Sequence, residues 1–120
     1  MQLLRASGQH RGQGYDLRAV TQGTAVGDCG VAEGTLLIEF AEAILGRDEA
    51  RLARARAAIM AAMGAAALVD AAGVAGLFNA IDRVADATGT PLEEGKAADT
   101  ASLREAIGID EFEALRARLE

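Results

Sequence analysis

Apolar residues recur at the three- and four-residue spacing of an α-helix through most of the chain after residue 34. Between residues 35 and 45 they line one face of a helix, and Gly46 is placed to end it. Asp48 is a suitable N-cap for a second helix, which Gly64 ends. No segment alternates apolar and polar residues for long enough to predict a sheet, so we expect an all-α fold. The apolar face of the first helix consists of Leu37, Phe40, Ala41 and Ile44.

A third and longest helix is expected over residues 66–88, with one continuous apolar stripe. A stripe of this kind normally faces the core, so this helix should be the central element of the fold. Gly89 is suited to cap its C-terminus, and Pro91 cannot continue the helix. The stripe consists of Val74, Leu77, Phe78, Ile81, Val84 and Ala85.

The first part of the chain is rich in glycine. Seven glycines stand between Gly8 and Gly34, a density that favours a loosely ordered arm. Within it, residues 17–20 fit either a short strand or a turn of helix. We therefore divide the chain into a glycine-rich arm, residues 1–34, and a helical domain, residues 35–120.

The last part of the chain carries two capping signals. After a polar linker over residues 91–98, Ser102 and Glu105 match a capping box, which predicts a short helix over residues 103–107. Asp110 and Glu113 match a second one, which predicts a helix over residues 111–119, with Gly108 between the two helices.

The composition makes a stand-alone monomer marginal. The 120 residues are 51% hydrophobic but only 3% aromatic, so alanine and aliphatic side chains must build the core. Each alanine buries little area and stabilises little. We therefore expect a homo-oligomer, which would bury the surplus alanine surface.

Charge and chain pattern exclude several classes of partner. A net charge of −6 argues against nucleic acid, and the basic cluster of Arg51, Arg54 and Arg56 is typical of a solvated surface. The first residues lack the apolar region of a signal peptide. The longest uncharged stretch, residues 57–69, is shorter than a bilayer requires, so we expect no membrane segment. A lone Cys29 fits a reducing compartment, and we expect the cytoplasm.

Residues 77–92 resemble the carboxy-terminal segment of the alkylhydroperoxidase D-like, or carboxymuconolactone decarboxylase-like, superfamily, and the similarity extends over about residues 36–112. The resemblance implies an alkylhydroperoxidase D-like helical bundle that forms oligomers. It rests on the pair Phe78-Asn79, on Arg83, on the run Ala85-Asp86-Ala87, on the exit Gly89-Thr90-Pro91-Leu92 and on the flanking Phe40-Ala41-Glu42-Ala43.

Peroxidatic members of that superfamily use a Cys-x-x-Cys motif, a histidine four residues after the second cysteine, and an upstream glutamate. If Cys29 were the first thiol, Ala32 and Leu36 would occupy the second thiol and histidine positions. If Cys29 were the second thiol, Val26 and Glu33 would occupy the first thiol and histidine positions. The catalytic half is therefore absent, and no catalytic role carries over to any residue.

Few residues are candidates for chemistry. Cys29 is a weak catalytic candidate that we expect to be exposed, but Asp28 and Glu33 nearby disfavour a thiolate. His10 has no second metal ligand or orienting carboxylate close in sequence. Four polar residues at helical spacing are expected to form a structural polar seam buried at a helix crossing. They are Asn79, Asp82, Arg83 and Asp86.

These features favour a non-catalytic structural or oligomerisation domain without a cofactor or metal. Its partner would be a second copy of the chain or a full-length paralogue that supplies the cysteine half. One alternative is a small thiol-dependent peroxidase-type oxidoreductase that uses Cys29 alone. Another is a small-molecule binding module with an apolar pocket between the first and third helices, near Phe40 and Phe78.

Overall fold

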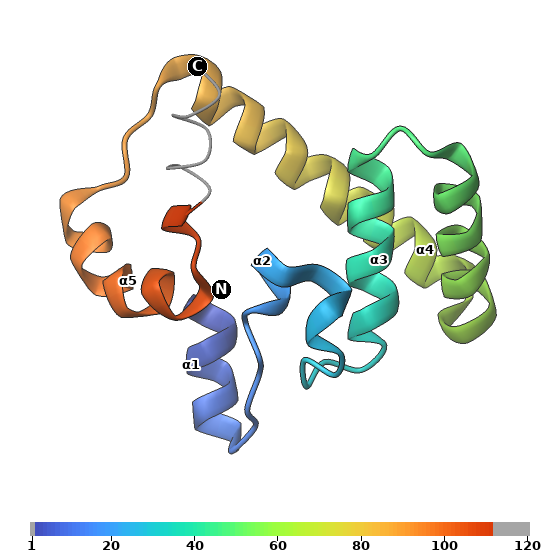
Figure 1. Ribbon diagram of the computed structural model, residues 1–120, viewed down its shortest axis with the longest axis horizontal. Coiled ribbons are helices and arrows are strands. Elements are labelled where there is room, and N and C mark those ends of the chain that lie inside the picture. The colour runs from blue at the N-terminus through green and yellow to red at the C-terminus, as the bar shows by residue number, and fades with distance from the viewer. Residues whose placement is uncertain (1, 112–120) are drawn as a thin grey trace. The chain divides into compact units, whose positions relative to one another are not determined.

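The computed structural model describes residues 2–111 of the chain, with side chains from residue 7 onward. Every regular element in that range is helical, so the all-α prediction is confirmed. The elements are α1 (Gln2–Arg11), α2 (Ala19–Gln22), the 3₁₀ turn η1 (Gly23–Val26), α3 (Gly34–Leu45), α4 (Glu49–Thr88) and α5 (Glu94–Ile107) (Figure 1).

The chain forms two compact units, which we describe separately. One unit is continuous and spans residues 32–91, with α3 and α4. The other combines residues 1–31 with the chain from Leu92 onward, and contains α1, α2, η1 and α5. The glycine-rich segment and the C-terminal segment, which we expected to be separate, thus share a unit.

In the 32–91 unit, α3 packs against α4 around a small core. Phe40 and Ala43 of α3 meet Ala55 and Ile59 of α4, and Ile59 is fully buried. Residues on both sides of the bend in α4 extend this cluster. They are Leu36, Leu37 and Ile44 on α3, and Leu52, Leu68 and Ala71 on α4.

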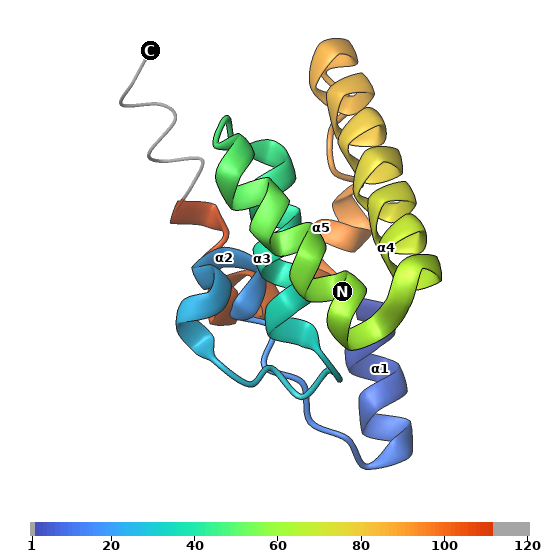
Figure 2. The same ribbon diagram turned by 90° about the vertical axis from the view of Figure 1, so that its right-hand side faces the viewer.

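Helix α4 has two straight parts that meet at Gly64. Its N-cap is Asp48, whose side chain accepts a hydrogen bond from the Arg51 amide, as predicted. Gly64 has φ 86° and ψ 174°, a conformation that only glycine adopts readily. The helix changes direction there, and Figure 2 shows the bend between the green and the yellow parts. Gly89 ends the helix in the left-handed conformation, with φ 64°, as expected.

The apolar stripe of the second part of α4 is exposed, which corrects our expectation that it faces the core. Its five large side chains are 51–62% exposed, and Ala85 is half-buried. The stripe is exposed because the second part of α4 is much longer than α3, which packs against it. Residues 65–88 extend over about 36 Å, whereas the 12 residues of α3 extend over about 18 Å. Helix α3 contacts the Leu68 and Ala71 side and leaves the stripe uncovered.

The other unit is more helical than expected. Residues 2–11, which we assigned to a loosely ordered arm, form α1. The reason is that only one glycine, Gly8, falls inside this segment, and the other six follow it. The alternative of a helical turn near residues 17–20 is the one found, as α2 begins at Ala19.

Helix α5 begins earlier than predicted. It starts at Glu94, so Ser102 lies inside the helix and residues 94–98 are not a linker. The C-terminal end of α5 lies where the sequence predicts it, because Gly108 caps the helix in the left-handed conformation. The Thr21 hydroxyl donates a 2.6 Å hydrogen bond to the Ile107 carbonyl near this end. The second predicted helix, residues 111–119, lies almost wholly outside the described residues.

One helix of the described range, α4, is long and apolar enough to cross a membrane by length and composition alone. The uncharged stretch of residues 57–69 ends at Asp70, and the apolar character of α4 continues beyond this single charge.

Candidate functional site

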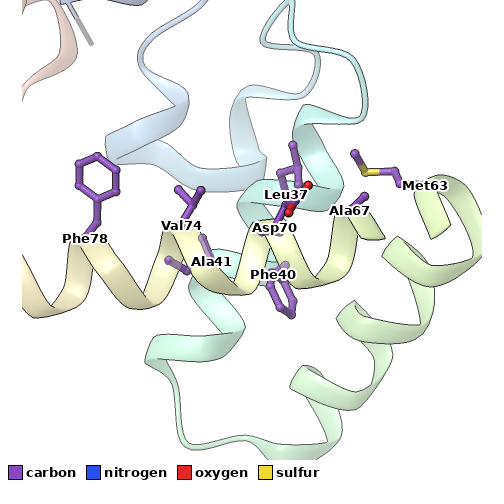
Figure 3. Close-up of a pocket in the computed structure, with 10 residues that line it drawn as sticks. Leu37, Phe40, Ala41, Met63, Ala67, Asp70, Val74 and Phe78 are labelled. Atoms are coloured by element: carbon purple, nitrogen blue, oxygen red, sulfur yellow. The ribbon is translucent and has the colours of Figure 1, made fainter. Parts of the chain in front are cut away.

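An apolar hollow of about 510 Å³ lies in the 32–91 unit, between α3 and the second part of α4. Phe40 and Phe78, the two residues near which a pocket was hypothesised, both line it. Figure 3 shows Phe78 and Val74 projecting from α4 and Phe40 on the crossing α3. The remaining lining residues are Leu37 and Ala41 of α3, and Met63, Ala67, Asp70, Ala71 and Ala75 of α4.

Asp70 is the one polar residue that lines the hollow. The residue is exposed, so its carboxylate remains hydrated while the hollow is empty. Sequence analysis missed this residue, although a signal was present. Asp70 interrupts the longest apolar stretch of the chain at a position that shares a helix face with Val74 and Leu77.

Arg51 joins the two helices of the unit through a carboxylate pair on α3. Its guanidinium donates 2.7 Å hydrogen bonds to both oxygens of Glu39 and a 2.5 Å bond to Glu42. Hydrogen bonds to Glu39 and Glu42 raise the pKa of Arg51, and the bond from Arg51 lowers the pKa of Glu39. Arg51 is therefore a structural cation rather than part of an anion-binding patch.

The predicted polar seam is only partly assembled, and most of it is exposed. Arg83 donates a 2.8 Å hydrogen bond to the Asn79 side chain one turn earlier, and Asn79 is half-buried. Asp82, Arg83 and Asp86 are exposed in a single copy of the chain. The reason is again that α3 does not reach this part of α4.

Cys29 is buried, with 7% of its surface exposed, which corrects the expected exposure. The Cys29 carbonyl accepts a 3.0 Å hydrogen bond from the Asp16 amide, so the chain at Cys29 lies beside residue 16. A buried thiol is poorly placed to meet peroxide or an external reductant. The geometry thus adds no support for a thiol-dependent reaction.

His10 is exposed near the end of α1. Within the part of the chain that the structure describes, no group of three or more metal-ligating side chains comes together. Neither residue 10 nor residue 29 is brought close to a catalytic partner by any contact in the described range.

Comparisons of the chain with protein-family models, with curated proteins and with solved structures found no match. The functional interpretation therefore rests on the hollow and on the exposed stripe of α4.

Proposed function

We propose that the chain is a non-catalytic helical module that pairs with a second copy of itself through the apolar stripe of α4. The observation that carries this proposal is the exposure of five large apolar side chains in one line on a straight helix. A contiguous exposed patch of this kind is typical of an interaction surface. The alanine-rich core of the unit is small, so burial of the stripe also adds stability that the core does not supply.

The stripe has the spacing of a coiled-coil seam. A seam that includes four residues of the stripe runs from residue 67 to residue 88, and its positions alternate three and four residues apart over three heptads. Such a seam packs side chains of one helix into holes formed by the facing helix. The a positions are Ala67, Val74, Ile81 and Thr88, and the d positions are Asp70, Leu77 and Val84.

The charge of Asp70 favours an antiparallel pair. In a parallel pair each d position faces its own copy, so two Asp70 carboxylates would repel each other. In an antiparallel pair a positions face d positions. Asp70 then lies opposite Thr88 of the second copy, a hydroxyl, and Leu77 lies opposite Ile81 of the second copy. This register also aligns the full length of the stripe.

A protein partner fits the stripe better than a bilayer does. The bend at Gly64 divides α4, and the straight apolar part from Ala65 to Ile81 has 17 residues. At 1.5 Å per residue it extends over about 26 Å, and it contains Asp70, whereas a spanning helix needs about 20 apolar residues.

The resemblance to the alkylhydroperoxidase D-like superfamily supports the same proposal, because the enzymes of that family are helical oligomers. A full-length member of the family is the second kind of partner that the stripe would accept. Its cysteine half would supply the chemistry that this chain lacks.

Cysteine cross-linking tests the pairing and its direction together. In a Cys29→Ala background, a Leu77→Cys protein is mixed with an Ile81→Cys protein, and disulfides are identified by mass spectrometry. We expect mixed 77–81 cross-links, because these positions face each other only in the antiparallel pair. Ala72→Cys, on the opposite face of α4, is the control and should not cross-link.

The other outcomes are distinct. Predominant 77–77 and 81–81 cross-links would show a parallel pair and contradict the direction. Cross-linking no greater than that of the Ala72→Cys control would contradict pairing through the stripe.

We also propose a second function, the binding of a small apolar molecule in the hollow. The observation that favours it is the cavity itself, whose volume of about 510 Å³ lies within the range of small-molecule pockets. Nine of its ten lining residues are apolar, so most of the lining would offer an apolar ligand hydrocarbon contacts.

A further inference from the structure

The hollow combines an apolar lining with a single charge. Its ten lining residues include two phenylalanines and a methionine, and none of them is basic. Asp70 is therefore a carboxylate without a cationic neighbour in the lining. Figure 3 shows it on the stretch of α4 between Ala67 and Val74, at the level of Leu37.

A ligand that is only apolar would place hydrocarbon against a hydrated carboxylate, and removal of that water is costly. An anionic ligand would add repulsion between like charges. A ligand with a positive group offsets both effects, because an ammonium donates charge-assisted hydrogen bonds to a carboxylate. The lining thus discriminates between ligands by the sign of their charge.

We infer that the hollow binds a small apolar molecule that carries an amine, with its hydrocarbon part against Phe40, Val74 and Phe78 and its ammonium on Asp70. This inference rests on the second proposed function and names its ligand class. Ala67, Asp70 and Val74 belong both to the hollow and to the seam, so a ligand in the hollow and a second copy on α4 compete for these side chains.

The test is an NMR titration of the isotope-labelled full chain carrying Leu77→Gln, an uncharged polar substitution in the seam but outside the lining, so that a second copy does not cover the hollow. The three probes have equal length: n-hexylamine, 1-hexanol and hexanoate. We expect all chemical-shift changes to centre on the lining residues. Hexylamine should bind about fivefold more tightly than hexanol, the upper range for an exposed ion pair. Hexanoate should bind more weakly than hexanol.

Two variants locate the charge effect. Asp70→Asn should abolish the preference for hexylamine over hexanol, and it should bind hexanol at least as tightly, because an amide costs less to desolvate than a carboxylate. Asp82→Asn removes the same charge from an exposed position on the same helix, outside the hollow, and should retain the preference.

Each result decides a separate point. Equal binding of hexylamine and hexanol by the protein that retains Asp70, or a preference that survives in Asp70→Asn, would overturn the amine inference while the hollow still binds apolar ligands. A preference lost equally in Asp82→Asn would also overturn it, since net charge would then explain the effect. Absence of shifts at the lining with every probe would overturn the second proposed function itself.

Discussion

Arg51 links α3 to the first part of α4 through hydrogen bonds to two carboxylates. It lies in the first turn of α4, where a positive charge opposes the helix dipole. Its three hydrogen bonds to Glu39 and Glu42 of α3 offset that unfavourable position. The pair of carboxylates on α3 is thus used for packing, not for chemistry.

We predict that Arg51→Gln lowers the denaturant midpoint of the chain, because both carboxylates lose a cation that spans the two helices. Arg56→Gln removes the same charge from an exposed position of α4 and should leave the midpoint nearly unchanged. Chemical denaturation followed by circular dichroism measures both. A loss of equal size in the two variants would show that net charge, not the contact, sets the effect.

The contribution of Arg51 depends on pH in a defined direction. Arg51 holds the pKa of Glu39 in the folded chain below its ordinary value of 4.5. The stabilisation is therefore fully present above pH 4.5 and is lost as the pH falls through the lowered pKa. The difference in midpoint between the unaltered chain and Arg51→Gln should shrink as the pH is lowered below 4.5.

At the scale of the element, Gly64 decides the shape of α4. A Cβ added at Gly64 or at Gly73 would meet no atom within 4 Å, so neither position is restricted by space. They differ in backbone: Gly64 has φ 86°, whereas Gly73 lies within a regular part of the helix. Gly64 is half-buried and Gly73 is exposed, but neither meets a neighbour, so the two glycines form a pair in which backbone conformation is the main difference.

We predict opposite effects for alanine at these two glycines. Gly64→Ala should destabilise the chain by about 1–3 kcal/mol, the cost of a side chain in a conformation reserved for glycine. Gly73→Ala should stabilise it by about 0.5–1 kcal/mol, because alanine is the better helix former. Thermal denaturation of both variants provides the measurement. A stabilised Gly64→Ala would mean that α4 is straight at this position in solution.

Element boundaries were predictable where a local signal decides them. Asp48, Gly89 and Gly108 cap helices as their residue types require. Ser102 does not cap a helix, because α5 already begins at Glu94 and Ser102 lies inside it. The loosely ordered arm was predicted from the glycine density of residues 1–34 taken together. The first ten of these residues contain only one glycine, so the density does not describe them.

The candidate site was less predictable, because contacts between elements decide it. The apolar face near Phe40 and Phe78 was visible from the helical spacing, but the role of Asp70 depends on where α3 crosses α4. Cys29 is buried where the chain returns to Asp16 after α2 and η1, and the Asp16 amide donates a hydrogen bond to its carbonyl. Neither contact leaves a periodic signal in the sequence.

At the scale of the whole molecule, the uncovered stripe explains how an alanine-rich chain of 120 residues gains stability. The described core of the 32–91 unit holds one fully buried large side chain, Ile59. Pairing of α4 would bury four further large residues of the seam in each copy: Val74, Leu77, Ile81 and Val84. Each exposed apolar side chain removed from water adds roughly 1 kcal/mol or more.

The central claim is that a second copy of the chain covers the stripe, and sedimentation of the 12.4 kDa chain over a range of concentrations tests it most directly. We predict a dimer for the unaltered chain and for Ala72→Glu, and a folded monomer for Leu77→Glu, because its carboxylate would lie against the apolar Ile81 of the second copy. Leu77 is 59% exposed in the single copy, so its substitution leaves the fold intact. A monomer at every concentration, or a dimer that Leu77→Glu leaves intact, would contradict the account.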